Sequence, residues 1–246
     1  MSNKKSHTIS NLSRGTWAAL ALFMLGLAVV AGFYFEQNTR ISAVEFIGHE
    51  FTSAESLEEA MISPVGLLAD SVDYGALYSS FRELPYVEDV AVRMSFRGTL
   101  TVEITERQPI GLLAGKPETY FDSAGVQLPS VPGTLVNVPL VYGFKATSPG
   151  DTLSGREFSH VKDFLIAAKN DPFGWATLSE VAWNRNEGVV ALSSENGVKL
   201  LFGRNGFEQK VTHWKAFYQD VVTRRGINSF RTVDLRFRNQ IVTDEL

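Results

Sequence analysis

The longest apolar stretch of the chain lies near its amino end. Residues 16–35 form a run of 20 residues without a charged side chain. At about 1.5 Å per residue, a helix of that length matches the hydrocarbon core of a bilayer, which is roughly 30 Å thick. Trp17 near one end and the aromatic residues 33–35 at the other suit the two headgroup interfaces. The pattern therefore predicts a single transmembrane helix over residues 16–35.

A cleaved signal peptide is the alternative for this stretch, because Val29 and Ala31 could satisfy the small-residue rule of a cleavage site. The apolar region of a signal peptide is only about 7 to 15 residues long, however. In addition, bulky aromatic residues follow Ala31. We therefore favour an uncleaved anchor.

Basic residues precede the apolar stretch. Lys4, Lys5 and Arg14 lie before it, and no acidic residue accompanies them. Because basic residues hold a flanking segment in the cytoplasm, residues 1–15 are predicted to be a cytoplasmic tail. Residues 36–246 are then expected on the other side of the cytoplasmic membrane, which in a bacterium is the periplasmic or extracytoplasmic face.

Residues 41–107 carry the pattern of a small unit with the order β-α-α-β-β. Alternating and β-branched residues predict the strands, a capping-box spacing opens the first helix, and Arg97-Gly98 predicts a hairpin turn. The predicted elements are a strand over 41–47, a helix over 52–61, a helix from 73 that stops at Leu84-Pro85, and strands over 87–96 and 100–105.

Residues 108–246 predict a second, mixed α+β unit built on an antiparallel sheet. Glycine and proline punctuate its short strands, whereas two stretches have apolar residues at helical spacing. The predicted helices cover residues 157–169 and 207–225. The predicted strands cover residues 119–122, 126–128, 138–142, 178–183, 188–192, 198–202, 231–237 and 240–243.

Composition and charge narrow the range of functions. The chain has 246 residues and no Cys, which excludes a disulfide scaffold, thiolate metal sites and a Cys nucleophile. A formal net charge of −4 argues against nucleic-acid binding, because such proteins neutralise phosphates with a basic face. Since the amino-terminal tail holds three basic residues, residues 36–246 carry 20 basic against 27 acidic side chains, a charge of −7.

Candidate catalytic motifs are weak. Gly111, Gly115 and Lys116 suggest a phosphate-binding loop, but they have three residues between the glycines where four are needed, and Pro117 follows the lysine. We expect a surface turn there. Similarly, residues 203–206 are expected to be a plain connection from a strand to a helix and not an anion site.

Titratable residues show no catalytic or metal-binding spacing either. Glu103 and Glu106 are expected on or beside an exposed strand face, where carboxylates are solvated by default. The histidines share no ligand spacing; they are His7, His49, His160 and His213. We therefore expect no catalytic residue, no metal, no cofactor and no small-molecule substrate.

The predicted strand over residues 231–237 carries more information. Val233, Leu235 and Phe237 alternate with charged residues, so that one face is apolar and the other polar. An ordinary amphipathic strand is one interpretation. If the strand lies at a sheet edge, its unpaired N–H and C=O groups could instead accept a strand from a partner.

Four segments in order resemble one family. The β-α-α-β-β unit resembles a polypeptide-transport-associated (POTRA) module. The whole chain, behind its predicted anchor, resembles the FtsQ/DivIB family of single-pass bacterial cell-division proteins. The segments that carry the resemblance are residues 44–48, 84–87, 98–109 and 233–237.

The resemblance implies a non-enzymatic scaffold of the divisome, located at the septum, that binds FtsB-like and FtsL-like proteins. Carried over onto this sequence, it places Phe237, Asn239 and Gln240 in the contact with a strand and adjacent helix of the FtsB-type subunit. Arg204, Lys210 and Arg236 would be nearby polar anchors, and Asp234 could instead hold the strand to its own domain. The alternatives are an adaptor for secretion or outer-membrane assembly, and a membrane-tethered cell-wall hydrolase.

Overall fold

The computed structural model describes residues 14–246, so the predicted cytoplasmic tail falls almost entirely outside the described residues. The chain forms two compact units. Unit 1 takes in the chain through His49, then Ala54–Phe81 and Val90–Ile104, whereas unit 2 consists of Glu50–Ser53, Arg82–Asp89 and Thr105–Leu246. This division does not follow the sequence boundary predicted at residues 107 and 108, which stays a prediction.

The first helix, α1 (Arg14–Asn38), covers the whole uncharged run of residues 16–35. The helix predicted there is thus present, and its large side chains at residues 17–30 are exposed. Among the described residues, no helix combines the length and the apolar character that a membrane span requires. The crossing of a membrane therefore stays a prediction.

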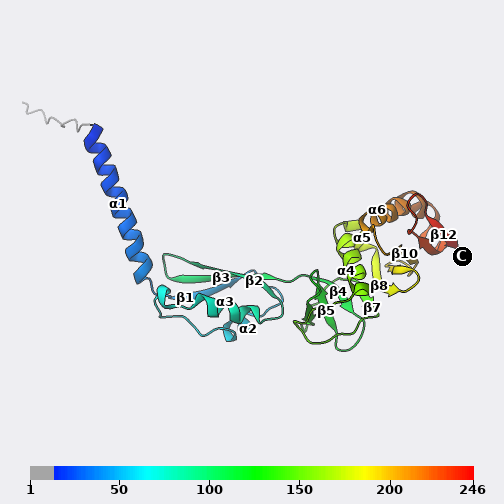
Figure 1. Ribbon diagram of the computed structural model, residues 1–246, viewed down its shortest axis with the longest axis horizontal. Coiled ribbons are helices and arrows are strands. Elements are labelled where there is room, and N and C mark those ends of the chain that lie inside the picture. Colours follow the sequence, from blue (N-terminus) through cyan, green and yellow to red (C-terminus); the bar gives the residue numbers. More distant parts are fainter. Residues whose placement is uncertain (1–13) are drawn as a thin grey trace, which may run out of the picture. The chain divides into compact units, whose positions relative to one another are not determined.

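Unit 1 has the predicted order of strands and helices. The elements that lie wholly or largely in unit 1 after α1 are β1 (Ala43–Ile47), α2 (Ala54–Glu59), a 3₁₀ turn at Ala69–Ser71, α3 (Tyr74–Arg82), β2 (Val87–Met94) and β3 (Thr99–Glu106). The sheet has the order β1-β3-β2, with β1 parallel to β3, and α2 and α3 lie on the same side of it (Figure 1). Leu57, Phe81 and Leu100 are fully buried in the core, so the apolar faces of helices and sheet meet as the periodicity requires.

Unit 2 is built on a nine-stranded sheet with the order β12-β11-β10-β9-β8-β7-β4-β5-β6 in the described part of the chain. The strands are β4 (Pro109–Leu113), β5 (Thr119–Asp122), β6 (Gln127–Pro129), β7 (Leu140–Tyr142), β8 (Leu178–Asn184), β9 (Gly188–Ser193), β10 (Lys199–Gly203), β11 (Phe230–Asp234) and β12 (Val242–Glu245). The prediction of an antiparallel sheet is wrong in part, because β10 and β11, β4 and β7, and β7 and β8 pair in parallel. Helices connect β7 to β8 and β10 to β11, whereas β5, β6 and loops lie between β4 and β7; each connection is long enough for a parallel pair.

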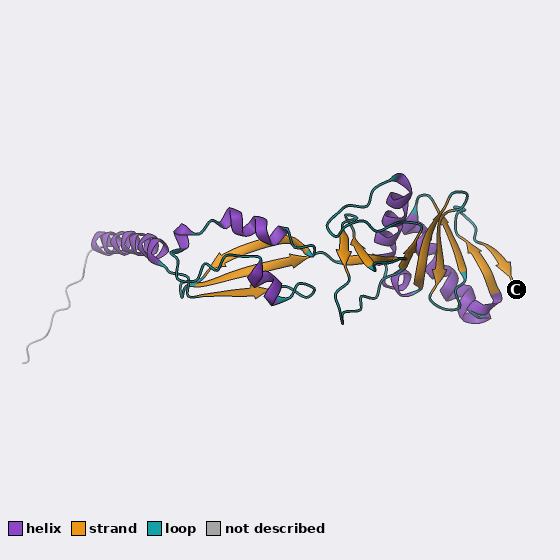
Figure 2. Ribbon diagram, turned by 90° about the horizontal axis from the view of Figure 1, so that it is seen from below, coloured by secondary structure: helices purple, strands orange, loops and turns teal. Residues whose placement is uncertain are grey.

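Two helices, α4 (Arg156–Lys169) and α6 (Phe207–Phe217), pack on each other, and α4 also packs on the sheet (Figure 2). Trp214 of α6 is fully buried in the core, and its Nε1 donates to Thr177 Oγ1 at 2.9 Å. The helical course continues through a π-helical turn, Tyr218–Val222, and α7 (Thr223–Arg225), as the prediction for residues 207–225 requires. One helix was missed: α5 (Pro172–Ala176), which the carboxylate of Asp171 caps.

The surface turn predicted over residues 111–116 is wrong in its first half only, because Gly115 and Lys116 do lie in an exposed bend. Residues 109–113 form β4, and Gly111 is buried there. A Cβ atom on Gly111 would lie 2.5 Å from the ring of Phe121 and 3.0 Å from Val141. The glycine is therefore needed for the close approach of these side chains to the strand, and not for a phosphate-binding loop.

The prediction that Glu106 is solvated is also wrong. Its side chain is buried, and its carboxylate accepts hydrogen bonds from the backbone N–H groups of Glu50, Phe51 and Thr52 at 2.6, 2.8 and 2.7 Å. Three donors compensate the desolvation of this charge. Glu103, by contrast, is partly exposed and pairs with Arg93.

Candidate functional site

The last strand, β12, lies at one end of the sheet of unit 2. It pairs antiparallel with β11, with Val233 opposite Thr243 and Asp234 opposite Val242. Most of β12 is exposed, and Val242 is 44% accessible. A strand in this position has one row of backbone N–H and C=O groups without a partner in its own sheet, and this row is a template for a further strand.

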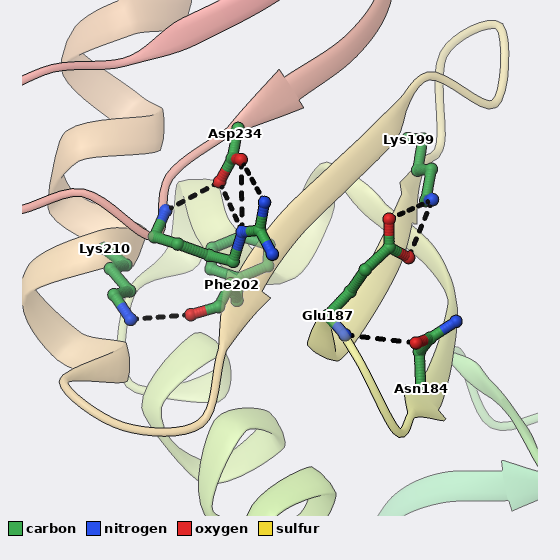
Figure 3. Close-up of polar contacts among 7 residues, drawn as sticks. Asn184, Glu187, Lys199, Phe202, Lys210 and Asp234 are labelled. Carbon is green, nitrogen blue, oxygen red and sulfur yellow. Dashed lines mark hydrogen bonds and ion pairs between the residues drawn. The ribbon is translucent and has the colours of Figure 1, made fainter.

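The strand predicted over residues 231–237 is too long. β11 ends at Asp234, whose carboxylate accepts a hydrogen bond from the backbone N–H of Arg236 at 3.0 Å and binds its guanidinium at 2.6–3.1 Å (Figure 3). This local bonding turns the chain away from the ladder. Leu235 stays fully buried, whereas Phe237 is 44% exposed beyond the strand end.

The pair of Asp234 and Arg236 is strongly held. Burial raises the pKa of Asp234, but the hydrogen bonds and charge of Arg236 outweigh that effect, and the pKa lies below the usual value. The hydrogen bond to Asp234 in turn raises the pKa of Arg236. Both groups are therefore charged at neutral pH, and together they fix the start of the loop over residues 235–241.

Lys210 of α6 lies next to this pair. Its Nζ donates to the carbonyl oxygens of Phe202 and Asn205, both at 2.7 Å, and Figure 3 shows the first of these bonds. Burial lowers the pKa of Lys210. A Cβ atom on Gly203 would lie 3.2 Å from Arg236 Cγ and 3.4 Å from Lys210 Nζ. The absence of a side chain at Gly203 thus makes room for the two cations at the end of β10.

Asn239 and Gln240 face α6 across a cavity of about 610 Å³. One face of the helix forms the opposite wall, through Gln209, His213 and Phe217. The spacing of these helix residues could have indicated the wall from the sequence, because residues 209, 213 and 217 share one face of a helix. The position of Asn239 and Gln240 opposite this helix face could not be inferred from such spacing.

Arg204 lies in a separate hollow of about 360 Å³. Its guanidinium lies over the ring of Trp183 and donates to the carbonyl oxygen of Arg185 at 2.5 Å, and His160 stacks on the same ring. Arg156 also lines this hollow. The structure thus brings Arg236 and Lys210 together but places Arg204 with aromatic and cationic side chains that no local sequence pattern connects with it.

Comparison with known proteins gives the context of this site. Residues 39–107 match the family model described as POTRA domain, FtsQ-type, and residues 108–244 match the one described as FtsQ/DivIB, C-terminal related. Within residues 14–246, no group of three or more His, Cys, Asp and Glu side chains is arranged to hold a metal ion.

Several curated relatives are similar over most of the chain. One from Rhodothermus marinus is 28% identical over 90% of this chain and 83% of its own length. One from Geobacter sp. is 24% identical over 71% of this chain and 65% of its own length, and one from Salinibacter ruber is 20% identical over 92% and 91%. Each of the three carries the name cell division protein FtsQ.

Proposed function

Because the chain belongs to the FtsQ/DivIB family of cell-division proteins, we propose that it is a membrane-anchored, non-enzymatic scaffold of the divisome. In this proposal α1 crosses the cytoplasmic membrane once, and residues 39–246 on the extracytoplasmic side bind other division proteins at the septum. β12 and the loop over residues 235–241 form the surface that binds an FtsB-like partner, together with an FtsL-like protein.

The anchor rests on the sequence of α1. The helix is 25 residues long and contains the uncharged run of residues 16–35. Large apolar side chains such as Leu22 and Phe23 are exposed all around it, which suits contact with lipid. Lys4 and Lys5 before the helix and Arg14 at its first position support an orientation with that end in the cytoplasm.

The partner surface rests on one observation above all, the open edge of β12. An extended segment of a partner could continue the sheet there through backbone hydrogen bonds, and side chains beside the edge would provide selectivity. Phe237 and Val242 are half exposed and apolar, so they offer area to be buried. The cavity lined by Asn239 and Gln240 could receive side chains from a helix next to the partner's strand.

A pull-down with the full-length protein from detergent-solubilised membranes tests the partner surface. Phe237→Glu places a charge where the partner would bury an aromatic ring. We expect capture of the FtsB-like and FtsL-like proteins to fall about tenfold or more, which corresponds to a loss of roughly 1.4 kcal/mol or more. Leu135→Glu is the matched control, since Leu135 is 97% exposed in another loop of unit 2.

Equal capture by Phe237→Glu and by the unchanged protein would rule out this surface. Localisation is tested separately, with a fluorescent tag on the amino-terminal tail. The tagged protein is expected in a band at midcell during constriction, and an even distribution around the cell envelope would contradict the proposed place in the divisome.

A further inference from the structure

Unit 1 exposes apolar side chains in two separate loops. Phe96 is 97% exposed at the turn between β2 and β3, and Ile62 is 95% exposed in the loop between α2 and the 3₁₀ turn. Val65 and Leu67 of the second loop are about half exposed. We call these four side chains the apolar rim. Single exposed apolar residues are common on protein surfaces, whereas a group of them in one place indicates a contact surface.

Both loops are bound to the same short stretch of chain, residues 39–42. The backbone N–H of Ile41 donates to the carbonyl oxygen of Leu67 at 2.9 Å, and the N–H of Gly66 donates to Ile41 at 2.7 Å. On the other side, the N–H of Ser42 donates to the carbonyl oxygen of Gly98 at 2.8 Å. The two loops therefore flank the segment that directly follows α1.

The turn that carries Phe96 is closed by hydrogen bonds. The N–H of Gly98 donates to the carbonyl oxygen of Ser95, and the N–H of Thr99 donates to Ser95 Oγ. Gly98 has a φ of +84°, and a Cβ atom there would lie 2.5 Å from the carbonyl oxygen of Arg40. The turn is thus held closely against the chain at Arg40, and Phe96 is displayed from a fixed backbone.

The chain length from α1 limits how far this rim can lie from the end of the helix. α1 ends at Asn38, and four residues of fully extended chain from there to Ser42 reach at most about 14 Å. Each headgroup layer is itself about 5 to 8 Å deep, the difference between the whole bilayer and its hydrocarbon core. If α1 crosses a bilayer, the apolar rim therefore lies close enough to the headgroup layer on that side to touch it.

The charges beside the rim suit lipid headgroups. Arg40 and Arg97 are both exposed, and Arg40 donates to the carbonyl oxygen of Gly66 at 2.9 Å, beside Val65. Arginine can bind a phosphate while its aliphatic stem covers apolar surface. A phenylalanine at the level of the headgroups, flanked by arginines, is an arrangement that favours interfacial binding.

We propose that the apolar rim of unit 1 contacts the extracytoplasmic surface of the membrane, with Phe96 and Val65 in the interfacial layer and Arg40 and Arg97 on the phosphates of anionic lipids. This inference rests on the proposed anchoring by α1. The contact would hold unit 1 at the membrane by a second, independent attachment beyond the helix.

Lipid quenching of single labels tests the contact, and the chain suits this method because it has no Cys. Full-length variants Phe96→Cys, Leu135→Cys and Leu25→Cys are labelled with an environment-sensitive fluorophore and reconstituted into vesicles of phosphatidylcholine and phosphatidylglycerol. Nitroxide-bearing lipids are then added. We expect quenching at Leu25→Cys within α1 and at Phe96→Cys, but not at Leu135→Cys, whose native side chain is as exposed as Phe96.

The outcomes separate the two proposals. Quenching at Leu25→Cys without quenching at Phe96→Cys would overturn the rim contact and leave the anchor intact. Absence of quenching at both positions would overturn the anchor and the rim contact with it. Quenching at Leu135→Cys equal to that at Phe96→Cys would show that any exposed part of the protein reaches the vesicle surface. That result would also overturn the inference.

A second measurement keeps Phe96 in place. A label at Val65→Cys is expected to be quenched in a chain with Phe96 and to lose that quenching when Phe96→Asp is added. Vesicles without phosphatidylglycerol should reduce the quenching, because Arg40 and Arg97 would lose the net negative surface charge that attracts them. Unchanged quenching after Phe96→Asp would refute the role given to Phe96.

Discussion

Replacing Glu106 by glutamine should release residues 50–52 from their place in unit 2. In the native protein Oε2 accepts the N–H groups of Glu50 and Phe51, and Oε1 accepts that of Thr52. An amide can accept at one atom only, so its NH₂ group would face at least one backbone donor. That unsatisfied donor costs about 1–3 kcal/mol, and the loss of charge from the remaining bonds adds roughly 1 kcal/mol.

Hydrogen exchange followed by mass spectrometry measures this cost on the full-length protein. A loss of about 2–4 kcal/mol in the free energy of local opening corresponds to exchange roughly 30- to 1000-fold faster at the amides of residues 50–52. Glu103→Gln is the matched control, because Glu103 lies on the same strand but is partly exposed and pairs with Arg93. The control should leave exchange at residues 50–52 unchanged.

Unchanged protection in Glu106→Gln would refute this reasoning. It would mean that packing, and not the carboxylate, holds the segment. The packing in question is the stack of Phe51 on Tyr86, with ring centres 4.8 Å apart. Burial raises the pKa of Tyr86 to about 12, so its hydroxyl stays protonated and donates to the carbonyl oxygen of Pro129 at 2.6 Å.

Two further predictions concern unit 2. The pKa of Asp234 is lowered in the folded protein. The stability that its charge provides is therefore complete above the usual Asp pKa of about 4 and is lost as the pH falls through the lower folded pKa. The protection of the Arg236 amide against hydrogen exchange, corrected for intrinsic exchange, should fall in that acidic range in the native protein but vary little with pH in Asp234→Asn, and equal pH profiles of the two proteins would contradict the role given to Asp234. Gly111→Ala would press a methyl group onto the buried ring of Phe121 and should lower stability by about 1–3 kcal/mol in thermal denaturation. Gly115→Ala, which meets no atom within 4 Å, is its control, and equal melting temperatures would show that the ring moves aside without cost.

Much of the fold could be predicted where the periodicity of apolar residues and a glycine-containing turn or stop indicate the same end of an element. β5 begins and ends as predicted, since a turn with Gly125 follows it directly. The long helical stretch from Phe207 is stopped by Gly226, which has a φ of +81°. β4 was missed because Pro109 and Gly111 resemble turn residues, and the need for glycine there arises only from Phe121, a contact that no local pattern reveals.

Less of the candidate site could be predicted. The alternation of Val233, Leu235 and Phe237 continues past Asp234, and a prediction from periodicity therefore extends the strand. In the structure the carboxylate of Asp234 binds the Arg236 backbone instead. The contact between Arg204 and the ring of Trp183 depends on how strands that are distant in the sequence align. No local sequence pattern indicates that contact.

Glu106 shows how such errors arise and how they can be reduced. Leu100, Val102 and Ile104 are buried at every second position of β3, and Glu106 continues that series. Periodicity alone thus indicates the inner face for Glu106, whereas the general exposure of carboxylates indicates the outer one. A charged residue in phase with a buried strand face needs several donors in order to remain there. Such a residue therefore predicts a neighbouring segment whose backbone N–H groups point at the carboxylate, which here is the chain at residues 50–52.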